Sequence, residues 1–503
     1  MNNMTDAVMT DTFDKGNAAF IAKRYASERR FKAYGAVALA VSVACLVYLI
    51  VDIGIKAWPS FFEHRAVLEI NLDASEIPAM DVLKGDFEGL VKNGFRNNFP
   101  GVTTRGDVKK LNSLLSVGAA DDLRLQTAAN PTNIGTTVKA DVLLSDDADL
   151  YFKGMLTKTA RTPGSTTLQL AQAGEEIIFT GDLSQLAVGQ IVRANGGALR
   201  IASVEADLAK AEAIMPPETL NTLTTGNWDI LSFSKAEADR RVDDRQIVWL
   251  ESLRDKGAIE KHFAWRFFTS GDSREPELAG LRGAIVGSLL TLIMTLSLSV
   301  PLGIAAAVYL EEFAAKNKWT EVIEVNINNL AAVPSIIFGL LGLAVFINFF
   351  GLPRSAPLVG GLVLALLVLP TIIIASRAAL KSVPPSIKEA ALGVGASHQQ
   401  AVFHHVLPLA MPGILTGTIL GVARALGETA PLLMIGMVAF IVDIPKGFTE
   451  AATVLPVQIY LWSDLPEVAF QSRTAAAIIV LLVILFCLNA VAIYLRKRFE
   501  RRW

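Results

Sequence analysis

The sequence is poor in the residues from which metal and disulfide sites are usually built. It holds two cysteines, Cys45 and Cys487, and five histidines among 503 residues. Both cysteines lie inside apolar runs, without the spacing of a disulfide framework or of a zinc site. We therefore interpret them as small apolar side chains and expect no bound metal or cofactor.

Signatures of catalysis are also missing. No stretch matches G-x-x-x-x-G-K-[ST], the loop that cradles nucleotide phosphates, so we expect no ATPase site in this chain. The long apolar runs hold no histidine and lack a nucleophile–base pair, which argues against an intramembrane enzyme. No kinase or receiver pattern is present either, although a membrane-anchored sensor stays an alternative. We predict no catalytic residues.

Long apolar runs are what the chain does have. Its mean hydropathy is +0.43, and a membrane span needs about 20 apolar residues. Six segments reach that length, namely 34–55, 283–310, 327–350, 358–376, 414–441 and 474–495. The first is too long for a signal peptide and no A-x-A site follows it, so we interpret it as an anchor. The sequence predicts a mainly α-helical, polytopic membrane protein.

A long polar region, 57–280, separates the first two apolar runs. It contains 24 basic and 32 acidic residues, a formal charge of −8, which is not the balance of a nucleic-acid-binding domain. Strand-like runs with period two and helical runs with period 3.6 predict an inserted α+β domain. Within it we expect a hairpin turn at Ala194–Ile201, a solvated turn at Ser145–Asp149 and a long charged helix over Glu237–Phe268.

Basic residues flank the first and last apolar runs and predict the orientation of the chain. Lys and Arg concentrate on the cytoplasmic side of membrane proteins. An even number of spans places both ends on one side, so we expect segment 1–33 and tail 496–503 to be cytoplasmic. The region 57–280 is then periplasmic, and the loops 311–326 and 377–413 are cytoplasmic. The basic residues are Lys23, Arg24, Arg29, Arg30, Lys32, Arg496, Lys497, Arg498, Arg501 and Arg502.

One cytoplasmic loop contains the stretch EAALGVGASHQQAVFHHVLP, Glu389 to Pro408. Pro384 and the proline after it end the preceding helix. A short helix is predicted to start at Ser386, an N-cap with Glu389 three residues on. Gly395 permits a sharp turn, and a second helical run leads to Pro408. We expect a helix–turn–helix at the membrane surface, with one apolar face formed by Ile387, Ala390, Ala391 and Val394.

A pair of opposite charges lies inside the fifth apolar run. An arginine in a span costs about 2.5–3.5 kcal/mol, and Arg424 has Glu428 four residues on, on the same helical face. One interpretation is that the two charges only neutralise each other or lock helices together. The other is a station for an oxyanion, because the planar guanidinium binds two oxygens at once. Pro431 predicts a local break in this helix.

The loop resembles a known family. Glu389-Ala390-Ala391, Gly395 and Leu407-Pro408 are similar to the EAA loop of binding-protein-dependent ABC importer permeases, with His405 as a departure from the usual aliphatic residue. The resemblance implies the type I ABC importer permease fold, with five core spans in 283–495 and a coupling loop over 381–410. It also implies that the loop docks on a cytoplasmic ATPase, and it assigns ATPase coupling to Glu389, Ala390, Ala391 and Gly395.

Two further stretches resemble one branch of that family more narrowly. RALGETAP, Arg424 to Pro431, is similar to the R-A-x-G-E-T-x-P stretch of PstA-type phosphate permeases, and VPSIIFGL, Val333 to Leu340, to their V-P-S-I-x-x-G-L stretch. The region 57–280 is similar to an extra N-terminal domain of some proteobacterial relatives. The resemblance implies a translocation path that includes Arg424, Glu428, Thr429 and Ser335.

The resemblance also implies an assembly in the bacterial inner membrane. This chain would form half of the anion path, and a PstC-like second permease subunit would complete it. PstB-like ATPase subunits would use ATP and Mg²⁺, and a PstS-like periplasmic phosphate-binding protein would deliver the anion. Charge chemistry alone admits any oxyanion, so another oxyanion as cargo and a phosphate-sensing role remain the alternatives.

Overall fold

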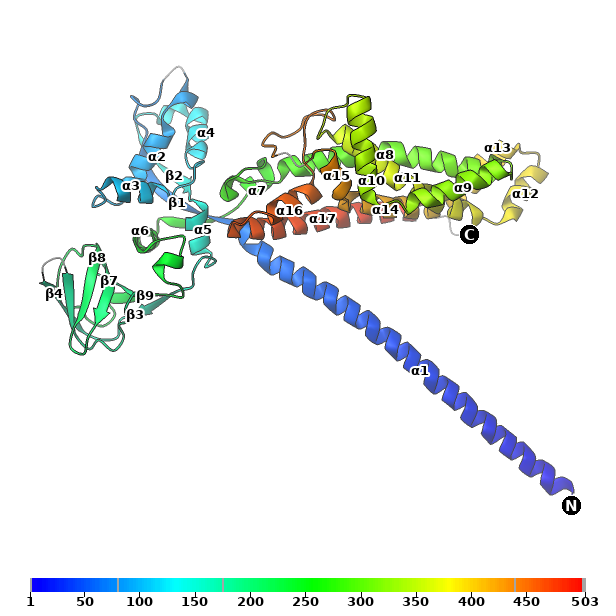
Figure 1. Ribbon diagram of the computed structural model, residues 1–503, viewed down its shortest axis with the longest axis horizontal. Coiled ribbons are helices and arrows are strands. Elements are labelled where there is room, and N and C mark those ends of the chain that lie inside the picture. The colour runs from blue at the N-terminus through cyan, green and yellow to red at the C-terminus, as the bar shows by residue number, and fades with distance from the viewer. Residues whose placement is uncertain (1, 79–80, 174–175, 438–439, 500–503) are drawn as a thin grey trace.

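The structure, a computed structural model, describes residues 2–78, 81–173, 176–437 and 440–499. A mixed α/β domain lies at one end of a set of long helices, and the short helices α12 (Pro385–Gly393) and α13 (His398–Ala401) lie at the other end (Figure 1). The first helix, α1 (Asn2–Ala57), diverges from the other long helices and contacts them near its C-terminal end, where Ala57 packs with Trp462 and Phe470.

Five helices in the described residues are long and apolar enough to cross a membrane. They are Lys23–Phe61, Arg282–Phe313, Pro357–Lys381, His398–Gly427 and Val468–Arg498. They correspond to α1 with η1 (Trp58–Phe61), α8 (Arg282–Val308) with η6 (Tyr309–Phe313), α11 (Pro357–Lys381), α13 with η8 (Val402–Val406) and α14 (Leu407–Gly427), and α17 (Val468–Phe499). A sixth apolar segment is the bent pair Lys318–Ala331 and Ser335–Phe349. The prediction of a polytopic helical protein is confirmed.

Two of the six predicted spans are not straight helices, and the bend in one of them was not predicted. The segment 327–350 straddles a bend of 103° between α9 (Lys318–Ala331) and α10 (Ser335–Leu341), which continues as η7 (Gly342–Phe349). Pro334 stands at this bend and disfavours helical backbone in the residue before it. In the segment 414–441 the break predicted at Pro431 is confirmed, because α14 ends at Gly427 and the short α15 (Ala430–Met434) follows.

Small residues bring the central helices close together. A Cβ on Gly303 of α8 would lie 2.6 Å from Ile372 of α11, and one on Gly417 of α14 would lie 2.2 Å from Ala375 of α11. Close approach through small residues is the usual way in which membrane helices pack. α11 is therefore held between α8 and α14 and forms the centre of the bundle. The remaining helix, α16 (Leu455–Ser463), packs on α17 and α8.

The mixed domain contains two antiparallel sheets. One has the order β10 (Ile259–Phe263), β1 (Phe62–Asn71), β2 (Thr137–Leu143). The other has the order β3 (Thr159–Pro163), β9 (Trp228–Phe233), β6 (Ile191–Ala194), β7 (Gly197–Val204), β8 (Ala209–Met215), β5 (Glu176–Gly181), β4 (Leu168–Ala173). The helices are α2 (Phe87–Arg96), α3 (Arg105–Asn112), α4 (Asp121–Ala129), α5 (Asp146–Phe152), α6 (Asp244–Asp255) and α7 (Arg266–Thr269), with short turns at Val82–Lys84, Pro131–Asn133, Glu237–Asp239 and Pro276–Leu278.

Local predictions for this domain had mixed outcomes. The hairpin turn is confirmed, because Asn195 and Gly196 join β6 to β7 with φ values of 49° and 73°. The long charged helix over Glu237–Phe268 is wrong. Helix α6 covers 12 residues of it, the chain turns at Gly257 with φ 66°, and β10 then pairs with β1. The solvated turn is also wrong, since Ser145–Asp149 begins α5.

Candidate functional site

The two stretches that resemble phosphate permeases lie against each other. Helix α10 packs on α15, and a Cβ on Gly339 would lie 2.7 Å from Cα of Pro431. Phe338, Ala425 and Leu432 belong to one buried apolar cluster. Residues about 90 positions apart in the chain are therefore in contact. The helix that follows the bend, α10, packs against the helix that follows the break, α15.

Arg424 and Glu428 form an ion pair even though α14 ends between them, which differs from the predicted pair on one helical face. Arg424 occupies the last turn of α14, and Glu428 is its C-cap with φ −77° and ψ 123°, so the two do not share a helical face. Their side chains still meet, with Arg424 Nε 3.5 Å from Glu428 Oε1. Arg424 is 41% exposed and Glu428 is 20% exposed. The guanidinium is thus held by one carboxylate while part of it stays free for another acceptor.

The two hydroxyl residues predicted for the path flank the same junction. Ser335 is the first residue of α10, directly after the bend. Thr429 stands between α14 and α15, and its carbonyl oxygen accepts from the backbone of Leu432 and Leu433. Both side chains are half-buried. The structure therefore places Arg424, Glu428, Thr429 and Ser335 on connected elements, and their role in transport stays a prediction.

The coupling loop is a short helix, a turn and a second helix, with three differences from the prediction. Helix α12 begins at Pro385 with Pro384 at the N-cap, so Ser386 is not the cap. The capping box belongs instead to Ser397 and Gln400 at the start of α13. Pro408 does not end the second run, because η8 continues directly into α14.

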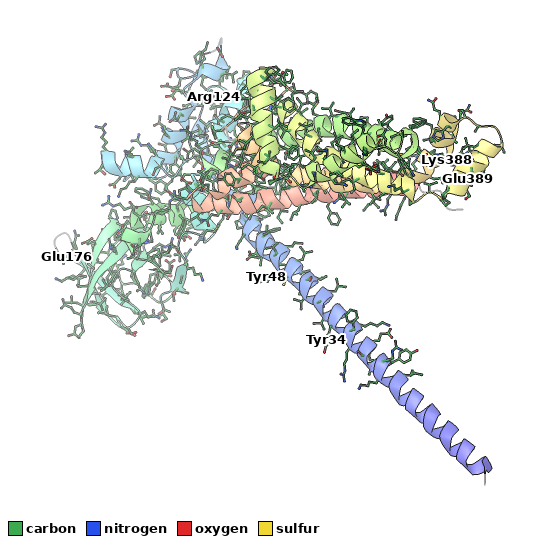
Figure 2. The ribbon with its side chains drawn as sticks, turned by 45° about the vertical axis from the view of Figure 1, so that its right-hand side comes forward. Tyr34, Tyr48, Arg124, Glu176, Lys388 and Glu389 are labelled. Atoms are coloured by element: carbon green, nitrogen blue, oxygen red, sulfur yellow. The ribbon has the colours of Figure 1, made fainter. Side chains whose placement is uncertain are left out.

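Most of α12 faces outward. Glu389 and Ala390 are exposed, Ala391 is buried, and Val394 is 88% exposed. The predicted apolar face is therefore wrong, since Ile387 and Ala391 turn inward and the other two members do not. Gly395 makes the turn at φ 91°, a conformation that favours glycine. Lys388 and Glu389 lie at the end of the long helices opposite to Glu176 of the mixed domain (Figure 2).

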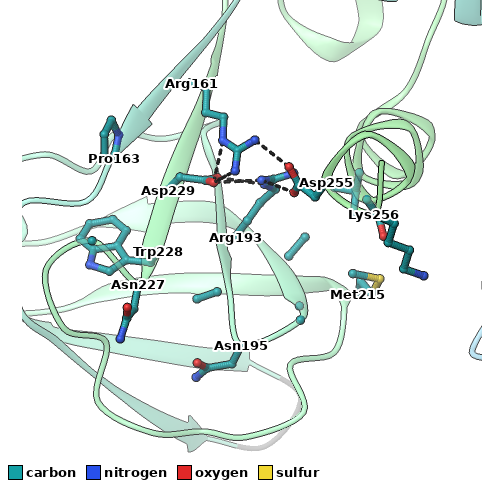
Figure 3. A pocket seen from close by; sticks show the side chains of 17 residues that line it. Arg161, Pro163, Arg193, Asn195, Met215, Asn227, Trp228, Asp229, Asp255 and Lys256 are labelled. Atoms are coloured by element: carbon teal, nitrogen blue, oxygen red, sulfur yellow. Dashed lines mark hydrogen bonds and ion pairs between the residues drawn. The ribbon is translucent and has the colours of Figure 1, made fainter. Parts of the chain in front are cut away.

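The mixed domain has a cleft of about 720 Å³ beside α6. Arg161, Arg193, Asp229 and Asp255 form a closed ion-pair ring there (Figure 3). Asp229 lies 2.9 Å from Arg193 Nε and 2.7 Å from Arg161. Because each charge already has an opposite partner, this ring joins the seven-stranded sheet to α6 and leaves little unsatisfied charge for a ligand.

A second charged cluster joins the mixed domain to the last long helix. Arg473 of α17 is buried at 8% exposure and donates to the carbonyl oxygen of Ala279 at 2.6 Å. Glu277 beside it is 6% exposed and accepts from Ser116 Oγ at 2.7 Å. Burial, and then the nearby carboxylate of Glu277, raises the pKa of Asp146 to about 7. We name Arg473, Glu277 and Asp146 the junction cluster.

Sequence reasoning missed this cluster and a glutamate pair, Glu311 and Glu312, at the end of α8. The sequence does show Arg473 at the start of the last apolar run, and Glu311 and Glu312 directly after the second apolar run. Their partners lie 194 and 76 residues away along the chain and could not be read from spacing. In the part of the chain that the structure describes, no group of three or more His, Cys, Asp or Glu side chains is arranged to hold a metal ion.

Comparison with family models defines the class of protein. Residues 299–503 match the model described as binding-protein-dependent transport system inner membrane component, and residues 18–162 match a domain of unknown function, DUF3333. The chain is thus a multi-pass inner membrane component of an ABC-type transport system, with the type I permease fold and an additional N-terminal α+β domain.

Individual relatives narrow the class. The chain is 31% identical over 256 residues to phosphate transport system permease protein PstA 1 of Mycobacterium tuberculosis strain H37Rv, a match that covers 51% of this chain and 82% of the relative. It is 28% identical to the PstA protein of Haemophilus influenzae, covering 47% and 81%. The chain belongs to the family of PstA phosphate transport system permease proteins.

A solved structure of the methionine ABC transporter MetNI, in an inward-facing conformation, is similar at 17% identity and a TM-score of 0.35. The match covers 44% of this chain and 96% of that one. The family assignment comes from the sequence matches and does not depend on this likeness.

Proposed function

We propose that this chain is the permease subunit of an ATP-driven phosphate importer and supplies half of the anion path. Membership of the PstA family carries the proposal. The partly exposed side chain of Arg424 and the break in the helix at Thr429 support it. A guanidinium beside non-helical backbone can release the carboxylate of Glu428 and bind an incoming oxyanion. A PstC-like subunit would cover this face and complete the path.

The same proposal assigns the exposed α12 to docking on a PstB-like ATPase, which uses ATP and Mg²⁺. Glu389, Ala390 and Gly395 lie on the outward side of this loop, while Ala391 seats it against the rest of the chain. The mixed domain, at the opposite end of the long helices, would then be periplasmic, next to a PstS-like phosphate-binding protein (Figure 1). If the bent pair of α9 and α10 is one span, it and the five long helices make six, an even number that supports cytoplasmic placement of both ends of the chain.

Uptake of radiolabelled phosphate by proteoliposomes tests the proposal. The vesicles contain this chain with its partner permease and ATPase, and the binding protein is added outside with phosphate or sulfate. We expect ATP-dependent phosphate uptake that excess sulfate does not compete away. Uptake of sulfate in place of phosphate would assign another oxyanion, and no uptake of either would contradict the importer function.

Variants of the charged pair test the path. Arg424→Gln loses hydrogen bonds to a charged acceptor that are worth about 1.5–3 kcal/mol, so we expect uptake to fall by about tenfold or more while the complex still assembles. Arg424→Lys keeps the charge but not the planar guanidinium, so its phosphate uptake should lie between that of the wild type and that of Arg424→Gln. Arg496→Gln, in the basic last turn of α17, is the matched control. If Arg424→Gln transports normally, the pair is structural.

A further inference from the structure

Two consecutive glutamates at the end of α8 contact different parts of the chain. The helix widens into the π-turn η6, which contains Glu311 and Glu312. Glu311 lies 3.4 Å from Arg377 and 3.5 Å from Lys381, both on α11. Glu312 points the other way, and its carboxylate lies 2.5 Å from Lys388 Nζ on α12. One turn of helix thus joins α8 both to the central helix α11 and to the coupling loop.

The backbone of Glu312 makes a second contact with the coupling loop. Its carbonyl oxygen lies 2.8 Å from His398 Nε2, the geometry of a ring N–H donating to a carbonyl. The neighbouring ring of Phe313 stands edge-on to His398, with centroids 5.0 Å apart. Lys388 belongs to α12 and His398 to α13, so residue 312 contacts the helices on both sides of the Gly395 turn. We call this set of contacts the Glu312 clamp.

Helix α12 packs on α13 and η8, and few side-chain contacts fix it to the rest of the chain. Of its nine residues, Ala391 is the buried one, and Pro384 and Gly395 bound it with backbone that is not helical. Among the described residues, Lys388–Glu312 is the ion pair that joins α12 to another element. The clamp is also shielded, since Glu312 is 10% exposed and Lys388 is 30% exposed. Shielding from water strengthens such a pair relative to one on an open surface.

At its other end, α8 reaches the elements on the far side of the bundle. Ser288 Oγ accepts from the backbone N–H of Leu455 at 2.8 Å, and Gly287 approaches the carbonyl oxygen of Thr453 so closely that a Cβ would lie 2.0 Å from it. α8 therefore links the coupling loop to the segment before α16 as one continuous helix.

We propose that Glu312 is a positioning residue that makes the coupling helix α12 move as one body with α8. A displacement of the docked ATPase is then transmitted to α8 through the Glu312 clamp, and through α8 to the opposite end of the bundle. The inference rests on the proposed function, because it assumes that α12 docks on the ATPase. It adds a residue outside the coupling loop to the parts that join ATP hydrolysis to transport.

Charge-swap variants in the reconstituted complex test the transmission. Phosphate uptake and ATP hydrolysis are measured in the same proteoliposomes, and their ratio is compared. We expect Glu312→Lys and Lys388→Glu each to lower phosphate moved per ATP severalfold while hydrolysis continues. The double variant should recover most of the ratio, whereas Glu321→Gln, an exposed glutamate of α9, should leave it unchanged. Normal ratios in both single variants, or no recovery in the double variant, would overturn the proposal.

A distance measurement tests the clamp without relying on phosphate transport. Spin labels are placed at Tyr309 and Val394, which are 61% and 88% exposed, after Cys45 and Cys487 have been replaced by serine. We expect a narrow distance distribution that Glu312→Gln broadens. An equally narrow distribution in the Glu312→Gln variant would show that the Glu312 carboxylate does not position α12 and would refute the proposed role of this residue. Wild-type vesicles that fail to take up phosphate would refute the proposed function instead, and the distance result would still decide the clamp.

Discussion

A single added methyl group at Gly339 tests whether the contact between α10 and α15 shapes the candidate path. The new Cβ in Gly339→Ala would lie 2.7 Å from Cα of Pro431, 2.8 Å from its carbonyl oxygen and 2.9 Å from Cβ of Met434. Ordinary contacts begin near 3.4 Å, and backbone atoms cannot rotate out of the way. α15 must therefore move outward, and Thr429 and Glu428 at its start must move with it.

Overpacking of this kind costs about 1–3 kcal/mol, and each kcal/mol lowers the melting temperature by about 2–4 °C in a chain segment of this size. We expect a lower melting temperature in detergent and phosphate uptake reduced severalfold. Gly427→Ala is the matched control, because its Cβ would meet no heavy atom within 4 Å. If both variants melt and transport like the wild type, the two motifs do not constrain each other and the reasoning fails.

Three other variants have defined expectations. The pKa of Asp146 is about 7 in the folded chain against an ordinary 3.8. Raising the pH from about 4 to 8 should therefore lower the stability of the folded state by about 4 kcal/mol. The melting temperature should fall over this pH range, and Asp146→Asn should make that fall smaller. Arg193→Ala removes one of the two arginines that pair with Asp229 and leaves Arg161 as its remaining partner, so it should lower the free energy of unfolding by about 1–3 kcal/mol, measured by denaturation; a neutral effect would contradict the ring. Gly395→Ala forces a φ of 91° on a residue with a Cβ, which costs about 1–3 kcal/mol of backbone strain. The variant should bind the ATPase more weakly in a pull-down titration, and unchanged affinity would show that the turn is adaptable.

The membrane segments were predictable because an apolar run of span length is a local property of the sequence. Pro431 signalled the break after α14, whereas the 103° bend at Pro334 was missed because its direction depends on how α10 packs on α15. In the mixed domain, the strand-like runs that the sequence predicted correspond to β1, β2 and β5 to β7, and the other strands were not predicted. The strands β3 and β10 were missed because polar and charged residues dominate these edge strands and hide the period of two.

The residues of the candidate site also fall into those that a local motif indicates and those that depend on distant partners. Glu389 and Arg424 were found because each stands inside a short motif whose spacing carries the signal. Glu312 and Arg473 were missed because their significance comes from partners that folding supplies, a lysine 76 residues on and a carbonyl group 194 residues back. Sequence reasoning thus singled out the loop that we expect to dock on the ATPase and the charged pair, while the contacts that hold them in place required the structure.

The junction cluster has a consequence for how such permeases exchange parts. Deleting residues 62–263 here would remove Asp146 and Ser116 while Arg473 and Glu277 remained, stripped of part of their cover. The mixed domain is therefore not a detachable cap, and transplanting it onto another permease would require an arginine at the position of Arg473 in the recipient.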